Sequence, residues 1–325
     1  MAYSPPFELS TQILNHVANI SVLVGSWVVQ HDRQPPSLRR ENRIKTIQAS
    51  LAVEQNTLSL EQVTAVIDGK RVLGHPREVQ EVVNAFAAYE SLPKWQPHSL
   101  DDLCAAHQFL MQGLIAGAGH WRCGGAGIYR GNQLVHMAPP ANQVPRLMKQ
   151  LADWLASTNV HPLVASAAFH YEFEFIHPFA DGNGRLGRLW QTLILSHWQP
   201  LFAYLPVETV IKDSQTAYYQ ALRDADQNSD CTPFIEFMLA AIETALQTAI
   251  YDNHSVREVE PEMRVKTRVE MRVKTPEAIL SLLQENPRQS LASVAQQLGV
   301  ATSTVERAVA KLQQEGRLKR IGPRK

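Results

Sequence analysis

Four side chains with complementary chemistry fall within one stretch of twelve residues, from His177 to Arg188. His177 is the one group there that can act as a neutral base near pH 7. Asp181 is the natural Mg²⁺ ligand, because Mg²⁺ bound together with phosphates usually takes only one or two carboxylates. Arg185 and Arg188 are three residues apart, so they lie on one side of a helical turn and could bind successive phosphates. The stretch thus combines a base, a metal ligand and two phosphate-binding groups.

The residues around these side chains predict a loop that runs into a helix. Gly182 and Gly184 flank Asn183 and let backbone N–H groups approach a ligand without obstruction by Cβ atoms. The segment 189–198 is apolar and compatible with a helix, whose N-terminus adds unpaired N–H groups and a positive dipole end. Together these features predict an anion site suited to phosphate. The alternative, a glycine-capped structural loop with solvated arginines, leaves the grouping of base, acid and arginines unexplained.

The same twelve residues resemble the signature of the Fic family, His-Pro-Phe-x-(Asp/Glu)-Gly-Asn-Gly-Arg-x-x-Arg, and match it at every fixed position. Most members of that family transfer AMP from ATP to a hydroxyl group of a target protein. The resemblance therefore implies a protein adenylyltransferase that uses ATP, with Mg²⁺ as cofactor at Asp181, His177 as catalytic base, and a Tyr, Thr or Ser of a target protein as acceptor. The residues it implies for ATP binding are Glu54, Asp181, Gly182, Asn183, Gly184, Arg185, Leu186, Gly187, Arg188, Tyr218 and Tyr219.

The composition fits a compact protein of two or three domains. The 325 residues are 45% hydrophobic and carry no formal net charge, which argues against wholesale binding to nucleic acid or to a membrane. Cys104, Cys123 and Cys231 are widely spaced, which disfavours zinc and disulfides and fits a cytoplasmic location. We expect no signal peptide and no membrane span, since the most apolar N-terminal segment, 13–29, is interrupted by polar residues.

Ser50 and Glu54 lie on a predicted helix and resemble a second Fic pattern, (Ser/Thr)-x-x-x-Glu-(Gly/Asn), which marks an inhibitory helix in many members. Gln55 departs from that pattern at its last position. The resemblance implies that Glu54 pairs with Arg188 and stops the ATP γ-phosphate from docking, because a carboxylate and a phosphate compete for one guanidinium. The alternative is an ordinary glutamate on a helix surface.

A glycine-rich segment predicts a turn followed by a short strand. It has seven glycines between residues 113 and 131, and Gln133-Leu-Val-His-Met follows. In Fic proteins a β-hairpin flap occupies this place and pairs with an extended target segment by strand addition. The resemblance therefore implies that the target docks on Leu134, Val135, His136 and Met137. A plain surface hairpin is the alternative.

Tyr218 and Tyr219 follow the motif at the distance where Fic proteins have a tyrosine pair beside the adenine. A tyrosine offers a flat face for stacking. The resemblance also implies that Asp226, seven residues after Tyr219, meets the ribose or the base, although the family often has Asn at that place. Core packing remains the competing interpretation for at least one of the two tyrosines.

The last fifty residues, 276–325, have eight Lys/Arg and four Asp/Glu and predict three short helices and a wing strand. This pattern resembles a winged helix-turn-helix domain, in which the third helix enters the major groove and the wing contacts phosphate. The resemblance implies base contacts by Thr302, Ser303, Thr304 and Arg307, and phosphate contacts by Arg317, Lys319 and Arg320. A winged helix that binds protein instead of DNA is the alternative.

The expected fold class is mainly α: a Fic-fold helical bundle with a small β-hairpin flap, followed by a winged-helix domain. The expected boundaries are 1–98 for an N-terminal helical domain with the inhibitory helix, 99–251 for the catalytic domain, 252–275 for a linker, and 276–325 for the winged helix-turn-helix. The linker has a repeat of period eight, since residues 262–267 recur at 270–275.

Several functional alternatives stay open at this point. A relative of the family could transfer phosphate or another nucleotide fragment, although the branch that does so alters the Gly-Asn-Gly-Arg part that this chain keeps. The enzyme could mainly remove AMP, with Glu54 orienting water. The protein could also be a DNA-binding regulator whose Fic domain senses nucleotide. Self-modification and a homodimer are open as well.

Overall fold

The computed structural model describes residues 3–31, 36–130, 133–251, 279–280, 282–284, 289–298, 302–314 and 316–319. These residues belong to two compact units, 1–250 and 251–325, which are taken separately below. The predicted linker, 252–275, lies outside the described residues.

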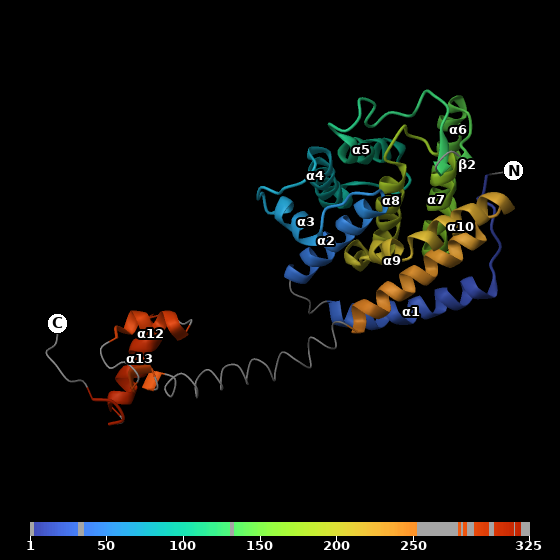
Figure 1. Cartoon of the computed structure of the whole chain (residues 1–325). Helices are drawn as coiled ribbons and strands as arrows, with labels where there is room; N and C mark the ends of the chain where they lie inside the picture. The colour runs from blue at the N-terminus through green and yellow to red at the C-terminus, as the bar shows by residue number, and fades with distance from the viewer. Residues whose placement is uncertain are drawn as a thin grey trace. The chain divides into compact units, whose positions relative to one another are not determined.

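The first unit is mainly helical, as the sequence predicts (Figure 1). The elements up to residue 251, in chain order, are α1 (Thr11–His31), α2 (Pro36–Val53), α3 (Leu60–Ile67), α4 (Pro76–Ser91), the 3₁₀ helix η1 (Leu92–Lys94), α5 (Leu100–Met111), β1 (Gly127–Arg130), β2 (Gln133–Met137), η2 (Ala141–Gln143), α6 (Val144–Ser157), α7 (Pro162–Ile176), α8 (Asn183–Trp198), η3 (Pro200–Tyr204), α9 (Val207–Asp213), α10 (Gln215–Asn228) and a last helix, Thr232–Tyr251.

Local signals in the sequence account for several helix starts. Ser59 and Gln62 form the predicted capping box at the start of α3, each side chain accepting a hydrogen bond from the other residue's backbone. Ser99 caps α5 as predicted, with Asp101 and Asp102 in the first turn. A proline also stands at the start of α4 and of α7, where its missing N–H has no intrahelical acceptor to lose.

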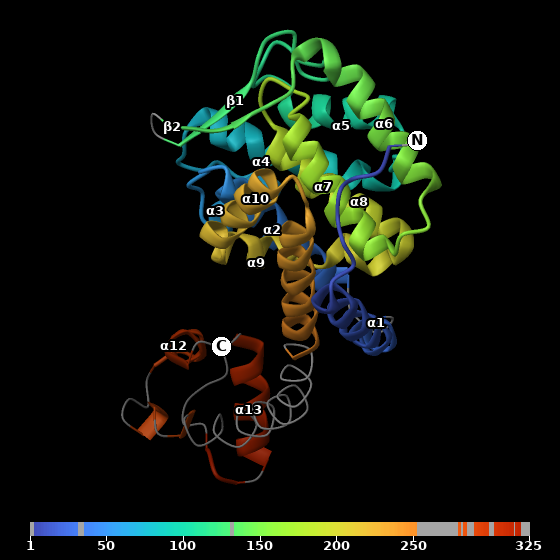
Figure 2. The same ribbon diagram turned by 90° about the vertical axis from the view of Figure 1, so that its right-hand side faces the viewer.

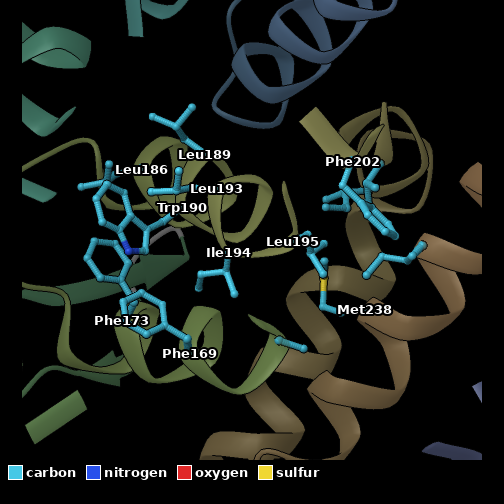
Figure 3. Packing of buried hydrophobic residues seen from close by; sticks show 14 of the residues in the cluster. Phe169, Phe173, Leu186, Leu189, Trp190, Leu193, Ile194, Leu195, Phe202 and Met238 are labelled. Atoms are coloured by element: carbon cyan, nitrogen blue, oxygen red, sulfur yellow. The ribbon is translucent and has the colours of Figure 1, made fainter. Parts of the chain in front are cut away.

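Helices α7 and α8 form the centre of the unit. They pack against each other, and nearly every residue of both is buried. Side chains from α7, α8, η3 and the helix Thr232–Tyr251 meet in one apolar core, whose labelled members are Phe169, Phe173, Leu186, Leu189, Trp190, Leu193, Ile194, Leu195, Phe202 and Met238 (Figure 3). This packing fixes the two ends that flank the predicted phosphate loop, namely the end of α7 and the start of α8.

The N-terminal helices share this core rather than forming one of their own. Helix α1 runs beside the helix Thr232–Tyr251 (Figures 1 and 2), and the contact includes His16 Nδ1 at 2.6 Å from Glu243 Oε2. Helix α2 packs against α9, α4 and α8, with Ile47 and Leu51 buried. The boundary expected at residue 98 therefore falls inside a single compact unit.

One helix in the described part, Thr232–Tyr251, is long and apolar enough to cross a membrane by length and composition alone, with a mean hydropathy of 1.3. Its apolar side belongs to the core, since Phe234, Ile235, Met238 and Ile242 are all fully buried. Of its most apolar window, 44% is buried within the protein.

Strands β1 and β2 form the predicted hairpin. They pair antiparallel, Gly127 opposite Met137 and Ile128 opposite His136, with a register irregularity between Ile128 and Tyr129. The side chain of Met137 is 64% exposed. The side chains of Leu134, Val135 and His136 lie outside what the structure describes, so their predicted contact with a target stays a prediction.

The second unit has a small core of its own, formed by Ile279, Val294, Ala295, Val305, Val309 and Leu312. The core joins the helical residues 279–280 and 282–284 to α12 (Leu291–Leu298) and α13 (Thr302–Gln314). Of the predicted DNA contacts, Thr302, Arg307, Arg317 and Lys319 are exposed. The side chains of Ser303 and Thr304 and the whole of Arg320 are not described, and residues 316–319 form no strand, so the wing is not seen in the described part.

Candidate active site

The predicted phosphate loop joins the two central helices through two backbone turns. Helix α7 ends at Ile176, and His177 adopts a left-handed conformation with φ of 49°. Gly182, with φ of 87°, precedes the first residue of α8. Asn183 is 98% buried, and its amide accepts from Phe179 N and donates to Phe179 O at 2.9 Å each. The Asn183 side chain therefore holds the loop together, and its predicted contact with ATP stays a prediction.

Arg122 and His107 hold the same loop from outside it, and no sequence pattern predicted either contact. Arg122 donates from Nε to His177 O at 2.7 Å, from Nη1 to Gly124 O at 2.8 Å and from Nη2 to Pro139 O at 2.5 Å. One guanidinium thus connects the end of α7 with both sides of the flap base. No local pattern distinguishes Arg122 from a surface arginine in a glycine-rich segment.

His107 stacks on Phe179, with ring centroids 3.6 Å apart. Its Nδ1 accepts from Gly119 N, so Nε2 carries the proton and donates to Asp181 O at 2.9 Å. Burial lowers the pKa of this imidazole to about 4, so the ring is neutral at physiological pH. His107 therefore shapes the loop and carries no charge to the phosphate site.

A cavity of about 600 Å³ lies beside this loop. Its wall includes the end of α2, β1, the end of α7, the start of α8, and α10. Of the residues predicted for catalysis or nucleotide binding, the wall contains His177, Glu54, Gly184, Arg188, Tyr218, Tyr219 and Asp226. One cavity thus brings together the predicted base, the second motif arginine, the predicted inhibitory glutamate and the tyrosine pair.

Leu186 and Gly187 are not in this wall, and neither are Asp181, Gly182, Asn183 and Arg185, so their predicted contact with ATP stays a prediction. Leu186 is fully buried in the apolar core. A Cβ at Gly187 would lie 2.8 Å from Glu174 Oε1 and 3.1 Å from His170 Nε2, so this glycine allows α8 to approach α7 closely.

Glu54 and Arg188, here called the inner pair, form the predicted ion pair, with Glu54 Oε1 at 2.8 Å from Arg188 Nη2. Arg188 also donates from Nη2 to Ser50 O at 2.9 Å and from Nε to Ser50 Oγ at 3.1 Å. Its side chain is 1% exposed, whereas that of Glu54 is 33% exposed. Burial is the largest single influence and lowers the pKa of Arg188, but the charges and the hydrogen bond of its neighbours, Glu54 foremost, together raise that pKa above its ordinary value. A Cβ at Gly184 would overlap Glu54 Oε1, so the glycine leaves room for this carboxylate.

The turn that carries Glu54 has a strained residue. Gln55 has φ of 68°, in the left-handed region, where Gly or Asn is favoured at the end of a helix. Gln215 Nε2 and Tyr219 OH both donate to Val53 O, at 2.8 and 3.4 Å, and tie the end of α2 to α10. The surrounding contacts therefore hold a residue type that the turn itself disfavours.

Arg185 and Asp181 form a second group with Arg77 and Glu81 of α4, here called the outer cluster. Arg185 is 2.9 Å from Asp181 Oδ1 and 3.1 Å from Glu81 Oε1, while Arg77 Nη2 is 3.1 Å from Asp181 Oδ2. Glu81 Oε2 also accepts from Asn56 Nδ2 at 2.9 Å, which links the cluster to the segment after Glu54. Two guanidinium groups and two carboxylates balance in charge here.

Asp181 fits the predicted Mg²⁺ role only together with a nucleotide. Its side chain is 41% exposed, so an ion can reach it. The described residues contain no group of three or more metal-ligating side chains, so phosphate oxygens and water would have to complete the coordination shell.

Tyr218 and Tyr219 differ in burial, which bears on the two roles predicted for them, core packing and stacking on adenine. Tyr218 is 1% exposed and its hydroxyl lies 3.2 Å from His170 Nε2, so most of its ring belongs to the core. Tyr219 is 38% exposed and is the better placed of the two to stack on a base.

Sequence profiles of two families match this chain. The Fic/DOC family matches residues 97–195, and a winged helix-turn-helix DNA-binding family matches residues 274–319. The crystal structure of a Fic family protein from Desulfovibrio desulfuricans G20 is 52% identical in sequence and covers 97% of this chain and 92% of its own, with a TM-score of 0.76. The chain belongs to the Fic family.

Curated relatives of this Fic protein include two named protein adenylyltransferases. Fic of Nematostella vectensis is 29% identical over 221 residues, which is 64% of this chain and 48% of the relative. The fic-1 protein of Caenorhabditis elegans is 29% identical over 236 residues, which is 68% of this chain and 44% of the relative. The chain therefore spans about half the length of the curated relatives it matches.

Proposed function

We propose that this Fic protein transfers AMP from ATP to a hydroxyl side chain of a target protein and releases pyrophosphate. The observation that carries the proposal is the shared wall of one cavity, in which His177 stands with Arg188, Gly184 and Tyr219. The names of the curated relatives support the same reaction.

In this proposal each group has one task. His177 takes the proton of the target hydroxyl as its oxygen attacks the α-phosphorus, and the bond from that phosphorus to pyrophosphate breaks. N–H groups at the start of α8 face the phosphate chain, Arg185 and Arg188 bind its outer phosphates, and Tyr219 stacks on adenine. Asp181 would hold Mg²⁺, which supplies neutralisation of the phosphate charge when bound.

Glu54 makes the described state an inhibited one in this account. Its carboxylate holds the guanidinium of Arg188, which an outer phosphate needs, and both cannot occupy it. The open strand edges of the β1–β2 hairpin are suited to an extended target segment.

The test is incubation of the full chain with α-³²P-ATP and Mg²⁺, alone and with a cell extract, followed by gel autoradiography. Wild type, Glu54→Gly and His177→Ala are compared, with γ-³²P-ATP as a parallel label. Label from α-³²P-ATP that rises in Glu54→Gly and is lost in His177→Ala is the expected result. Label from γ-³²P-ATP would indicate phosphate transfer instead. No label in any variant that still binds ATP would contradict AMP transfer and favour AMP removal, which is tested on a pre-labelled target.

We also propose that the second unit binds DNA. The match of residues 274–319 to a DNA-binding winged helix-turn-helix family supports this, as do the exposed Arg307, Arg317 and Lys319. A gel shift on genomic fragments should weaken steeply with added salt, because phosphate contacts release counterions. Arg307→Gln should weaken sequence-specific binding, and retention that is equal on all fragments at all salt concentrations would contradict the proposal.

A further inference from the structure

Glu174 is a carboxylate in the cavity wall to which the proposed transfer gives no role. It lies one turn before His177 on α7 and is 8% exposed. Its Oε2 is 4.0 Å from His177 Nδ1, and its Oε1 is 3.8 Å from His170 Nε2. Glu174 Oε1 has no hydrogen-bond partner among the described residues. A buried carboxylate in that condition destabilises a fold, so its position calls for a functional explanation.

Helix α8 makes room for this carboxylate. A Cβ at Gly187 of α8 would come within 2.8 Å of Glu174 Oε1, so only glycine fits there without moving Glu174. The contact between α7 and α8 therefore accommodates Glu174, which also belongs to the cavity wall.

His170 cannot be the partner that Glu174 lacks. It is fully buried, and burial lowers the pKa of its imidazole to about 3, so the ring is neutral. Its Nδ1 lies 2.6 Å from Gln191 Oε1 and its Nε2 lies 3.2 Å from Tyr218 OH. With Nδ1–H donating to Gln191, Nε2 accepts from Tyr218 and has no proton to offer. His177 is the remaining imidazole within reach of Glu174.

We propose that Glu174 is a positioning residue for the base. Its carboxylate accepts a hydrogen bond from Nδ1–H of His177 and so keeps Nε2 unprotonated and turned toward the target hydroxyl. The backbone of His177 is held by Arg122, so a rotation of the two side chains is enough to shorten 4.0 Å to a hydrogen bond of about 3 Å. This deepens the proposed AMP transfer and rests on it for its catalytic meaning.

The proposed step balances without a further proton acceptor. The hydroxyl proton moves to Nε2 of His177, the hydroxyl oxygen bonds to the α-phosphorus, and pyrophosphate leaves. The Nδ1 proton stays on the imidazolium, which the Glu174 carboxylate stabilises by charge and by orientation, as carboxylates do beside catalytic histidines elsewhere.

Glu54, at the end of α2, affects the pKa of Glu174. Burial first, and the charge of Glu54 second, raise the pKa of the Glu174 carboxyl to about 8, while Arg188 of α8 opposes them. The remaining titratable groups around Glu174 are His170 and His177, described above, and the two hydroxyls of Tyr218 and Tyr219 on α10. With Glu54 in place, Glu174 is thus mostly protonated at pH 7 and gives His177 no charge. Removing the charge of Glu54 lowers the pKa of Glu174, so the inhibitory glutamate also weakens the base.

The test is NMR of the histidine side chains in the full chain, which needs no transfer activity. His177 is compared in Glu54→Gln and in Glu54→Gln with Glu174→Gln, a change that keeps the shape. We expect the Nδ1–H tautomer in the first, and in the second a mixture with Nε2–H and a His177 pKa lower by roughly one pH unit. Glu172→Gln in the same background is the matched control, because Glu172 lies on α7, is buried, and pairs with Tyr3 instead. Glu174→Met serves as a second variant if Glu174→Gln unfolds.

Activity then separates the two proposals. In the Glu54→Gln background, Glu174→Gln should lower kcat about tenfold, leave the KM for ATP unchanged, and shift the acidic limb of the pH profile with the His177 pKa. An unchanged His177 tautomer and pKa in both Glu174 variants would overturn the positioning role, whatever the activity. A changed tautomer in a protein that transfers no AMP would leave the positioning role intact and overturn the proposed function.

Discussion

Arg185 and Arg188 stand one helical turn apart in the same motif, yet the protein holds them in different ways. In the outer cluster, Arg185 contacts the carboxylates of Asp181 and Glu81. Arg77 binds Asp181, and Asn56 donates a hydrogen bond to Glu81. In the inner pair, Arg188 has one carboxylate within hydrogen-bond distance among the described residues, and Glu54 presents it from a turn with a left-handed glutamine. Opening the inner pair takes the movement of one partly exposed side chain, whereas opening the outer cluster takes several. We infer from this comparison that Arg188 is the arginine that inhibition would switch, while Arg185 would bind phosphate from within its cluster.

The largest effect should come from a change that touches neither arginine. His177→Ala removes the base and should lower AMP transfer at least 10²- to 10⁴-fold, because general-base assistance is typically worth that much. The affinity for ATP should stay within a few-fold, since both arginines are intact. Transfer rates and calorimetric ATP titration measure the two quantities. A variant that loses ATP binding as well would mean that His177 supports the phosphate loop.

The buried carboxyl of Glu174 should also make the free energy of unfolding depend on pH. The pKa of Glu174 is about 8 in the folded protein, above the ordinary value of 4.5 for the unfolded chain. The native state therefore binds this proton more tightly than the unfolded state does. The resulting contribution to the free energy of unfolding is complete below about pH 4.5 and is lost as the pH rises to about 8. The loss is at most about 1.4 kcal/mol per pH unit. Glu174→Gln removes this loss, so its advantage in melting temperature over wild type should grow from pH 5 to pH 8. An advantage that is constant with pH would show that Glu174 titrates normally.

The smallest effect should come from the turn that presents Glu54. Gln55→Gly relieves a left-handed side chain, which costs roughly 1–2 kcal/mol, and should raise the free energy of unfolding by about 1 kcal/mol. The inhibited state should gain the same amount, so basal AMP transfer should fall about fivefold. Denaturant unfolding and transfer rates measure this, with Gln55→Asn as a milder variant. A rise in transfer would mean that glycine loosens the turn and that inhibition by Glu54 needs a rigid turn.

The sequence predicted the helices and strands better than the contacts between side chains. Helix boundaries followed from apolar spacing and from caps such as Ser59 and Ser99, which act within a few residues. The contact of Glu54 with Arg188 was expected only because two motifs resembled those of a known family. Arg122, His107, Glu81 and Glu174 could not be found in this way, because each acquires its role from a group that the fold brings close.

Membership in the motif also did not reveal which residues build the loop and the core. Leu186 is fully buried in the apolar core, and Gly187 lets α8 approach Glu174 of α7 closely. The Asn183 side chain holds the loop through two hydrogen bonds with Phe179. These packing roles depend on the turn of α8, which a linear motif does not display.

The most direct test of the account is a comparison of ATP and AMP binding by calorimetry in wild type, Glu54→Gln and Glu81→Gln. Glu54→Gln should raise the affinity for ATP about 10- to 100-fold, the value of one charge-assisted hydrogen bond of roughly 1.5–3 kcal/mol, and leave the affinity for AMP unchanged. Glu81→Gln, the matched change in the outer cluster, should not raise either affinity. An equal gain for ATP and AMP in Glu54→Gln, or a gain for ATP in Glu81→Gln as large as that in Glu54→Gln, would contradict the claim that Glu54 competes with the outer phosphates for Arg188.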